Sequence, residues 1–324
     1  MNKSVQLLLI AVFFIAVSCQ KNELENQLEQ PELKSPDEYY VGLKGATIPM
    51  LTPERLEKMN KKLESEGVNY RVAMAELITT GSVENIGLGH LVIAKDLGNK
   101  QLDVDFAPGD PRRAWSDESG TKITFSIDQT GDATPSGGLL NAEEGTEAIR
   151  KAFKTWDDVQ STEIGLTEVD NGGEDIGIVA FINNIGGSPY VFADIQIAGW
   201  GDIDFELGVL GVTYTFLFID GDGEYTDINH DKKYDAAFRE IYFDPSYEWA
   251  NGGMNGIDVE SIALHEIGHG LSQAHFGTVF FDKKGELRAT PRAVMNAYYF
   301  GTFRNLQKSD IGGHSSIWAN WPNK

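Results

Sequence analysis

The segment 265–275 reads HEIGHGLSQAH and constrains this chain more than any other feature. His265 and His269 are four residues apart, so on a helix both imidazoles project from one face. His275 follows in the same motif, and a turn after the helix would bring it to the same point. Three imidazoles leave the fourth position of a tetrahedral zinc ion open for water, which is typical of catalytic zinc.

Glu266 directly follows the first histidine of the motif. From that position a carboxylate can reach a metal-bound water without being a ligand itself, so Glu266 is the candidate general base. The alternative is a helix that carries solvated histidines. The chain has only 6 histidines, and three of them fall at ligand spacing, so the sequence strongly favours the metal site.

The charge and the cysteine count exclude several classes of protein. The 324 residues include 27 Lys+Arg and 49 Asp+Glu, which gives a formal net charge of −22. A chain this acidic lacks the basic face that a phosphate backbone requires, so we expect no nucleic-acid partner. The single cysteine, Cys19, excludes an intramolecular disulfide, a cysteine zinc finger and an iron–sulfur cluster.

The N-terminus predicts export. Residues 1–18 contain an apolar run from Val5 to Val17, which is long enough for a signal peptide and too short for a stable membrane anchor. The run ends at Ala-Val-Ser-Cys, which resembles a bacterial lipobox and predicts lipidation of Cys19. The alternative is a plain signal peptide. The polar residues 19–38 then form a tether, so we expect a lipoprotein of the outer membrane or cell surface, or a secreted protein.

A first region, residues 39–115, precedes the motif region and could be a propeptide or an accessory domain. The sequence predicts one helix from Thr52 to Ala75, with Pro53 at its first position, and short strands at 91–93 and 102–106. The Pro-Gly-Asp-Pro segment at 108–111 favours a turn, and we place a boundary there.

The second region, residues 116–324, mixes strands and helices. Alternating or continuous apolar runs predict strands, and apolar stripes at helical spacing predict helices. We expect strands at 123–127, 176–182, 209–219 and 240–243, and helices at 141–159, from Asp258 through the histidine motif, and at 309–318. This arrangement predicts an α+β fold, with one larger domain behind a smaller N-terminal region.

The second region resembles a known family. Its motif matches the metzincin pattern HExxHxxGxxH followed by a Met-turn, with the glycine replaced. Within that clan it is most similar to the matrixins, the matrix metalloproteinase family. The resemblance also covers AFKTW at 152–156, GVLG at 208–211, Phe243-Asp244 with Trp249, AVM at 293–295, and the start of the last helix within 306–317.

The resemblance implies a zinc-dependent endopeptidase with a zincin-like catalytic domain, which has a twisted mixed sheet, an active-site helix and a C-terminal helix. It also implies that Met295 forms the Met-turn and packs beneath the metal without binding it. In that reading Glu266 takes a proton from the attacking water and passes it to the leaving nitrogen. We expect a monomer with one catalytic zinc ion.

The resemblance also implies where a peptide substrate binds. The substrate would lie extended along an edge strand near Gly208, Val209 and Leu210, held by main-chain hydrogen bonds. Tyr299 falls where the family has a tyrosine in the wall of its specificity pocket. An alternative role for Tyr298 or Tyr299 is a phenol that stabilises the tetrahedral intermediate.

Three departures from the family limit the resemblance. Ser272 stands where the family has a glycine, so we expect a strained backbone or a different turn there. The histidines His90, His230 and His314 are scattered, so we expect no second, structural zinc site. A cysteine switch is not expected either, because Cys19 belongs to the leader.

An acidic segment, residues 220–235, is a second candidate metal site. Alternate oxygens around a cation are typical of calcium loops. The candidate calcium ligands are Asp227, Asn229, Asp231 and Asp235, with Asp220 and Asp222 as a second, shorter set. The alternative is a solvated hairpin tip, because neither set has the bidentate Glu of an EF-hand.

Two further questions stay open at the level of sequence. Phe106 to Asp110 resembles the aspartate switch of astacins with one extra residue, but a linker turn explains the same residues and is favoured. The predicted function is hydrolysis of peptide bonds. The rival readings are a non-catalytic surface lipoprotein, such as an adhesin or glycan binder on a zincin scaffold, and a zinc hydrolase of non-peptide amides.

Overall fold

The computed structural model describes residues 51–80, 96–98, 100–113, 120–130, 140–201, 203–252, 256–284 and 286–323. The predicted leader, Cys19, the tether, the strand at 91–93 and His90 lie outside these described residues. All of the described residues belong to one compact unit that runs from Pro36 to Lys324.

A mixed eight-stranded sheet forms the centre of this unit, in the order β14-β1-β8-β9-β7-β5-β6, with β4 paired to β9. Strands β1, β8 and β9 pair antiparallel, and the other pairs in this sheet are parallel. Its strands are β1 (Tyr70–Thr80), β4 (Val104–Asp105), β5 (Thr124–Ile127), β6 (Thr167–Glu168), β7 (Ile195–Gly199), β8 (Val209–Phe218), β9 (Tyr234–Phe243) and β14 (Tyr298–Tyr299). Three short two-stranded sheets join β2 (Asp96–Gly98) to β3 (Gln101–Leu102), β10 (Trp249–Ala250) to β11 (Ile257–Asp258), and β12 (Thr278–Phe281) to β13 (Leu287–Thr290).

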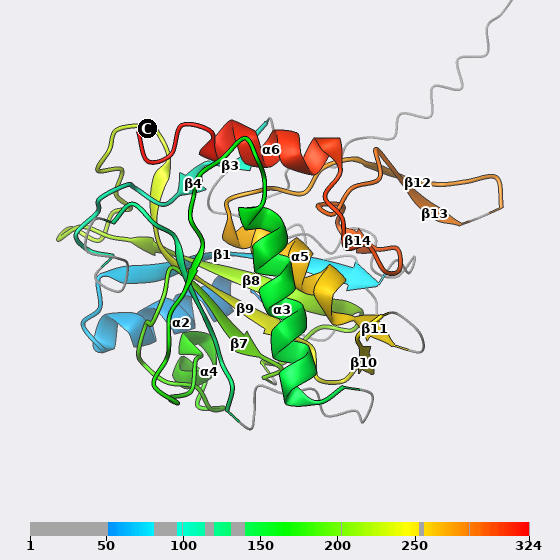
Figure 1. The fold of residues 1–324 in the computed structure, drawn as a ribbon. Coiled ribbons are helices and arrows are strands. Elements are labelled where there is room, and N and C mark those ends of the chain that lie inside the picture. Colours follow the sequence, from blue (N-terminus) through cyan, green and yellow to red (C-terminus); the bar gives the residue numbers. More distant parts are fainter. Residues whose placement is uncertain are drawn as a thin grey trace, which may run out of the picture. The chain divides into compact units, whose positions relative to one another are not determined.

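Helices cover both faces of the central sheet (Figure 1). The described helices are α2 (Pro53–Ser65), α3 (Ala142–Asp157), α4 (Ile178–Ile182), α5 (Val259–Gly270) and α6 (Lys308–Trp318). Helices α3 and α5 lie side by side and contribute to one apolar core, whereas α2 and α4 contribute to a second core. The first two histidines of the motif therefore lie on a buried helix that packs against both the sheet and α3.

The pairing of α3 with α5 follows from local sequence. Asn141 and Glu144 form a capping box that begins α3, and the apolar stripe of this helix includes Trp156. The indole nitrogen of Trp156 donates a hydrogen bond to the backbone oxygen of Leu264 on α5, at 2.8 Å. Asp258 caps α5 by accepting a hydrogen bond from the backbone nitrogen of Ser261, at 2.9 Å. These contacts fix the position of the helix that carries His265 and His269.

The predicted helix from Thr52 to Ala75 is wrong in its second half. Helix α2 begins after the Thr52 cap as expected, but it ends at Ser65, and Gly67 follows with φ of 73°. Glycine adopts this left-handed conformation without steric cost and commonly ends helices. The residues after it form strand β1. Nearly all side chains of β1 are buried, so its sequence lacks the alternation of apolar and polar residues that predicts a strand.

The predicted strand at 176–182 is also wrong, because residues Ile178–Ile182 form the short helix α4. The buried carboxylate of Glu240 accepts hydrogen bonds from the backbone nitrogens of Ile178 and Val179, at 2.7 and 2.9 Å. A carboxylate at this end of a helix satisfies backbone N–H groups that lack helical partners. A short apolar run cannot by itself distinguish a strand from a buried helix.

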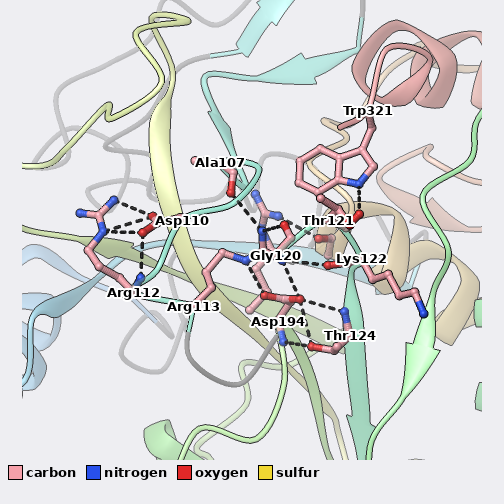
Figure 2. Close-up of polar contacts among 12 residues, drawn as sticks. Ala107, Asp110, Arg112, Arg113, Gly120, Thr121, Lys122, Thr124, Asp194 and Trp321 are labelled. Atoms are coloured by element: carbon pink, nitrogen blue, oxygen red, sulfur yellow. Dashed lines mark hydrogen bonds and ion pairs between the residues drawn. The ribbon is translucent and has the colours of Figure 1, made fainter. Parts of the chain in front are cut away.

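The turn at 108–111, where we place a boundary, does not separate the packing of the first region from that of the second. Strand β4 from the first region pairs with β9 from the second, and Phe106 lies in the main core. Arg113 and Asp194 form a fully buried ion pair, with Nε and Oδ1 2.7 Å apart (Figure 2). Asp194 also accepts a hydrogen bond from the backbone nitrogen of Thr124, at 2.8 Å. Residues 100–113 are thus built into the same sheet and core as the second region.

Other expectations are confirmed by the structure. Strand β5 covers most of 123–127, β8 covers most of 209–219, and β9 includes 240–243. Helices α3, α5 and α6 lie where the sequence places them, and the fold is α+β as expected. Among the described residues, no helix has the length and apolar character that crossing a membrane requires.

Candidate active site

The three motif histidines converge on one point. His265 and His269 lie on α5, and His275 follows on the chain after the helix. The Nε2 atoms of His265 and His269 are 3.0 Å apart, and Nε2 of His275 lies 3.1 and 3.0 Å from them. Within the described part of the chain, these histidines form the one group of three or more side chains that could hold a metal ion.

Backbone carbonyls orient two of the rings. Nδ1 of His265 lies 2.7 Å from the oxygen of Val294, and Nδ1 of His269 lies 2.8 Å from the oxygen of Gln273. A carbonyl oxygen only accepts hydrogen bonds, so Nδ1 carries the proton and the Nε2 lone pairs point at the common centre. Converging lone pairs at these distances repel one another unless a cation lies between them. The donor set therefore fits zinc.

Burial and a neighbouring carboxylate shift the pKa of a histidine in opposite directions. Burial lowers the pKa of His265 well below its ordinary value and so favours the neutral, metal-binding ring. Burial also lowers the pKa of His269, but the carboxylate of Glu76 raises it overall. Oε1 of Glu76 lies 3.2 Å from Nδ1 of His269, and both side chains are fully buried. The first region thus contributes an acidic side chain beside a motif histidine.

Glu266 is fully buried beside the histidine cluster. Its Oε2 accepts a hydrogen bond of 2.6 Å from the hydroxyl of Thr213 on β8, whereas its Oε1 has no hydrogen-bond partner. Burial raises the pKa of Glu266 to about 7, against the opposing effects of His269 and Thr213. A base whose pKa lies near neutral pH can both take up and release a proton. Oε1 is the oxygen of this carboxylate that could accept a proton.

Met295 packs directly against the active-site helix, as the resemblance implies. Its turn is held by Asp310 of α6, whose carboxylate accepts hydrogen bonds from the backbone nitrogens of Val294 and Met295, at 3.1 and 3.2 Å. A Cβ atom built on Gly268 would lie 2.3 Å from the sulfur of Met295. Because Gly268 has no side chain, it leaves room for Met295.

We expect Gly268→Ala to lower the free energy of unfolding by about 1 to 2 kcal/mol. The clash with the Met295 sulfur costs about 1–3 kcal/mol, and the helix propensity of alanine recovers less than that. Urea denaturation measures the change. Gly270→Ala on the same helix is the control, because its Cβ would meet Ile195 at 3.3 Å. An equal or larger loss in the control would contradict the packing explanation.

Ser272 adopts a positive φ of 66°, so the strain expected from its replacement of glycine is confirmed. Its backbone nitrogen donates to the oxygen of His269, at 2.9 Å. This left-handed residue ends the helix and redirects the chain towards His275.

The predicted substrate-binding residues are placed differently from expectation. Gly208 precedes β8, and Val209 and Leu210 are its first residues. Strand β8 is not an edge strand, because it pairs with β9 on one side and with β1 on the other. Tyr299 does line a pocket, whose other lining residues include Ile78, Ser261, Val294 and Phe303. Its hydroxyl accepts a hydrogen bond from the backbone nitrogen of Asp258, at 3.2 Å. The substrate contacts themselves stay predictions.

The acidic segment does not gather its carboxylates into one cluster of the kind that the histidines form. Asp235 pairs with Arg112 at 2.7 Å, and Oδ1 of Asp227 accepts from the backbone nitrogen of Asp231, at 3.1 Å. Oδ1 of Asp220 accepts from the backbone nitrogens of Asp222 and Glu224. Calcium binding by Asp227, Asn229, Asp231 and Asp235, or by Asp220 and Asp222, therefore stays a prediction.

Asp110 does not point at the histidines. Its carboxylate is held by the guanidinium of Arg112, with Nη2 and Oδ2 2.7 Å apart (Figure 2). Arg112 in turn stacks on the ring of Phe218, the last residue of β8. Its place favours the linker turn over the aspartate switch.

Of the remaining histidines, His230 lies on the exposed acidic loop and His314 is buried in α6.

Three residues of the site were not singled out for these roles from the sequence. Glu76, Thr213 and Asp310 act through long-range contacts with His269, Glu266 and the Met-turn. Their only local signal is a polar residue inside an otherwise apolar strand, or an acidic residue at the start of a helix. Neither signal identifies a partner that is far away in the sequence.

Comparisons with known proteins agree with this geometry. The family model described as Matrixin matches residues 114–319. The chain is 27% identical to "Matrix metalloproteinase-19" of Mus musculus over 137 residues, which are 41% of this chain and 22% of that protein. It is 29% identical to "Hatching enzyme" of Paracentrotus lividus over 185 residues, 56% of this chain and 23% of that protein. The chain thus spans less than a quarter of these relatives' length. By its family model, the chain belongs to the matrixin family.

Proposed function

We propose that this chain is a zinc-dependent endopeptidase. The observation that carries the proposal is the convergence of three Nε2 atoms within 3.1 Å of one another, beside the buried carboxylate of Glu266. His265, His269 and His275 would hold the zinc ion. When bound, zinc polarises a carbonyl and makes water a nucleophile near neutral pH.

The residues around the metal would divide the remaining work. Thr213 holds Oε2 of Glu266, which leaves Oε1 to accept a proton from water and to return it to the leaving nitrogen. Val294 and Gln273 fix the rings of His265 and His269 through their carbonyl oxygens. His265 and His269 are buried, whereas His275 is partly exposed.

The proposal is tested with the purified full chain. We expect about one zinc ion per chain by elemental analysis, and cleavage of casein that stops when a chelator is added and returns with zinc. His275→Ala should lose the zinc ion. Zinc bound elsewhere, unaffected by that substitution, would contradict the assignment of the ligands.

The same assay separates the rival functions. A non-catalytic surface protein would bind zinc and cleave no member of a peptide library. A hydrolase of non-peptide amides would spare the library but cleave small acyl amides. The carboxylate of Glu266 favours an enzyme, because a purely structural site has no need of it. Export, lipidation of Cys19 and a calcium ion at residues 220–235 remain proposals from the sequence.

A further inference from the structure

Glu76 is a fully buried glutamate in the middle of strand β1. Its neighbours Ala75 and Leu77 pack in the core that α2 shares. Successive side chains of a strand point to opposite faces of the sheet, so Glu76 lies on the other face, where it meets His269 of α5. The helix with the first two motif histidines therefore packs over an acidic side chain.

A buried carboxylate is costly unless a positive charge or a hydrogen-bond donor compensates it. Within the described residues, neither side-chain oxygen of Glu76 has a hydrogen-bond partner. The ion-pair contact of this side chain is with His269, whose Nδ1 lies 3.2 Å from Oε1. The Nδ1 proton of that ring faces the backbone oxygen of Gln273, at 2.8 Å. Glu76 therefore acts on the ring mainly through its charge.

The buried cation Arg239 does not take the place of this partner. Its Nη1 donates a hydrogen bond to the backbone oxygen of Gly270, at 2.8 Å, and its Nε donates to the hydroxyl of Thr215, at 3.2 Å. Arg239 interacts with Glu76 only at longer range, and the described residues show no ion pair between them. The carboxylate thus remains available to a cation on the side of His269.

The proposed metal site has an excess of positive charge. Three neutral imidazoles leave both charges of a zinc ion uncompensated, and Glu266 supplies at most one negative charge. His265 and His269 are buried, so water screens these charges little. A second carboxylate behind one ligand ring would reduce the excess.

The sheet places this second carboxylate beside the group that holds the general base. Glu76 on β1 is paired in register with Thr213 on β8, so the two side chains share one face of the sheet. The hydroxyl of Thr213 donates to Oε2 of Glu266, at 2.6 Å. One cross-strand pair therefore contacts both a candidate metal ligand and the candidate base.

We propose that Glu76 is a positioning residue of the metal site, whose negative charge acts through the ring of His269 and strengthens the binding of zinc. This inference rests on the proposed zinc-dependent function. The carboxylate does not touch the metal or the substrate. It makes the ring a better electron donor and offsets the charge of the ion. The first region then supplies one component of the metal site.

The test compares charge with shape. The metal is removed from the purified full chain, and zinc affinity is measured by competition with a chelator of known affinity. Glu76→Gln keeps the shape but loses the charge, and zinc affinity should fall by about 10- to 100-fold. Glu76→Asp keeps the charge on a shorter side chain and should lose much less. If Glu76→Gln does not fold, Glu76→Met removes the charge at nearly the same length.

The control variant is Glu240→Gln. Glu240 is the carboxylate that holds the backbone nitrogens of Ile178 and Val179, and it is also fully buried in the central sheet. Its substitution should lower the free energy of unfolding, measured with urea, but leave zinc affinity unchanged. A loss of zinc affinity in Glu240→Gln as large as that in Glu76→Gln would show that general destabilisation explains both, and would overturn the inference.

The remaining outcomes separate this inference from the proposed function. If the parent chain binds zinc and Glu76→Gln binds it as tightly, Glu76 has no such role, and the peptidase function stands. A loss in Glu76→Asp equal to or larger than that in Glu76→Gln would indicate packing in place of charge, and would also overturn the inference. If the parent chain binds no zinc, the proposed function fails, and this inference fails with it.

Discussion

Glu266→Gln should reduce peptide turnover by about 10²- to 10⁴-fold and leave the zinc content unchanged. Glutamine has nearly the same shape as glutamate and can keep the hydrogen bond to Thr213, but it cannot accept a proton from water. Turnover of a quenched-fluorescent peptide, measured with elemental analysis of the same sample, checks both halves of this expectation.

The matched control is Glu260→Gln. Glu260 lies on the same helix and is also mostly buried, but it pairs with Arg304, at 3.2 Å, and not with the histidine cluster. Its substitution should leave turnover nearly unchanged. A parallel loss of zinc and activity in Glu266→Gln would show that Glu266 supports the metal site and is not its general base.

His314→Phe should make the chain much less sensitive to acid. His314 is buried, neither ring nitrogen has a hydrogen-bond partner, and burial lowers its pKa from 6.5 to about 3. The folded chain therefore holds this ring neutral, whereas the unfolded chain protonates it below pH 6.5. The neutral ring of His314 contributes fully to the free energy of unfolding above pH 6.5, and this contribution is lost as the pH falls towards 3. Between pH 7 and pH 4, the free energy of unfolding should fall by about 3 kcal/mol because of this group.

Urea denaturation at pH 7 and pH 4 measures this effect as the difference between the parent chain and His314→Phe. Phenylalanine can keep the ring contact with Trp156, whose centroid lies 5.1 Å from that of His314. Other groups titrate in the same range, but they do so in both proteins and cancel in the comparison. His230→Phe on the exposed loop is the control for replacing a histidine by phenylalanine. The same slope in all three proteins would mean that His314 is protonated in the folded state.

The histidine cluster could be predicted from the sequence because its geometry is local. Two ligands lie one helical turn apart, and Ser272 supplies the bend that brings the third. The Met-turn was predictable only through the resemblance, since nothing near Met295 shows that it packs against Gly268. The fold class followed from the alternation of apolar runs, and most strands and helices of the second region lie where these runs predict them.

The placement of β1 could not be predicted in the same way. Its partners, β8 and β14, lie far along the chain, and its nearly continuous burial removes the alternation that marks a half-exposed strand. The helical stripe of α2 also runs into it without a clear break, apart from Gly67. The role of Glu76 depends entirely on this pairing, which is why its contact with His269 has no signature in the sequence.

Helix α6 stabilises the Met-turn through Asp310, and this turn orients one of the motif histidines. The ring of His265 is oriented by the carbonyl oxygen of Val294, whose turn is fixed by Asp310. Near the C-terminus, the indole nitrogen of Trp321 donates a hydrogen bond to the oxygen of Thr121, at 2.6 Å (Figure 2). A nascent chain that ends before residue 310 has all three histidines but not the contacts that aim them. If the proposed function is right, we therefore expect a chain truncated before residue 310 to bind zinc less tightly than the full chain and to cleave no peptide.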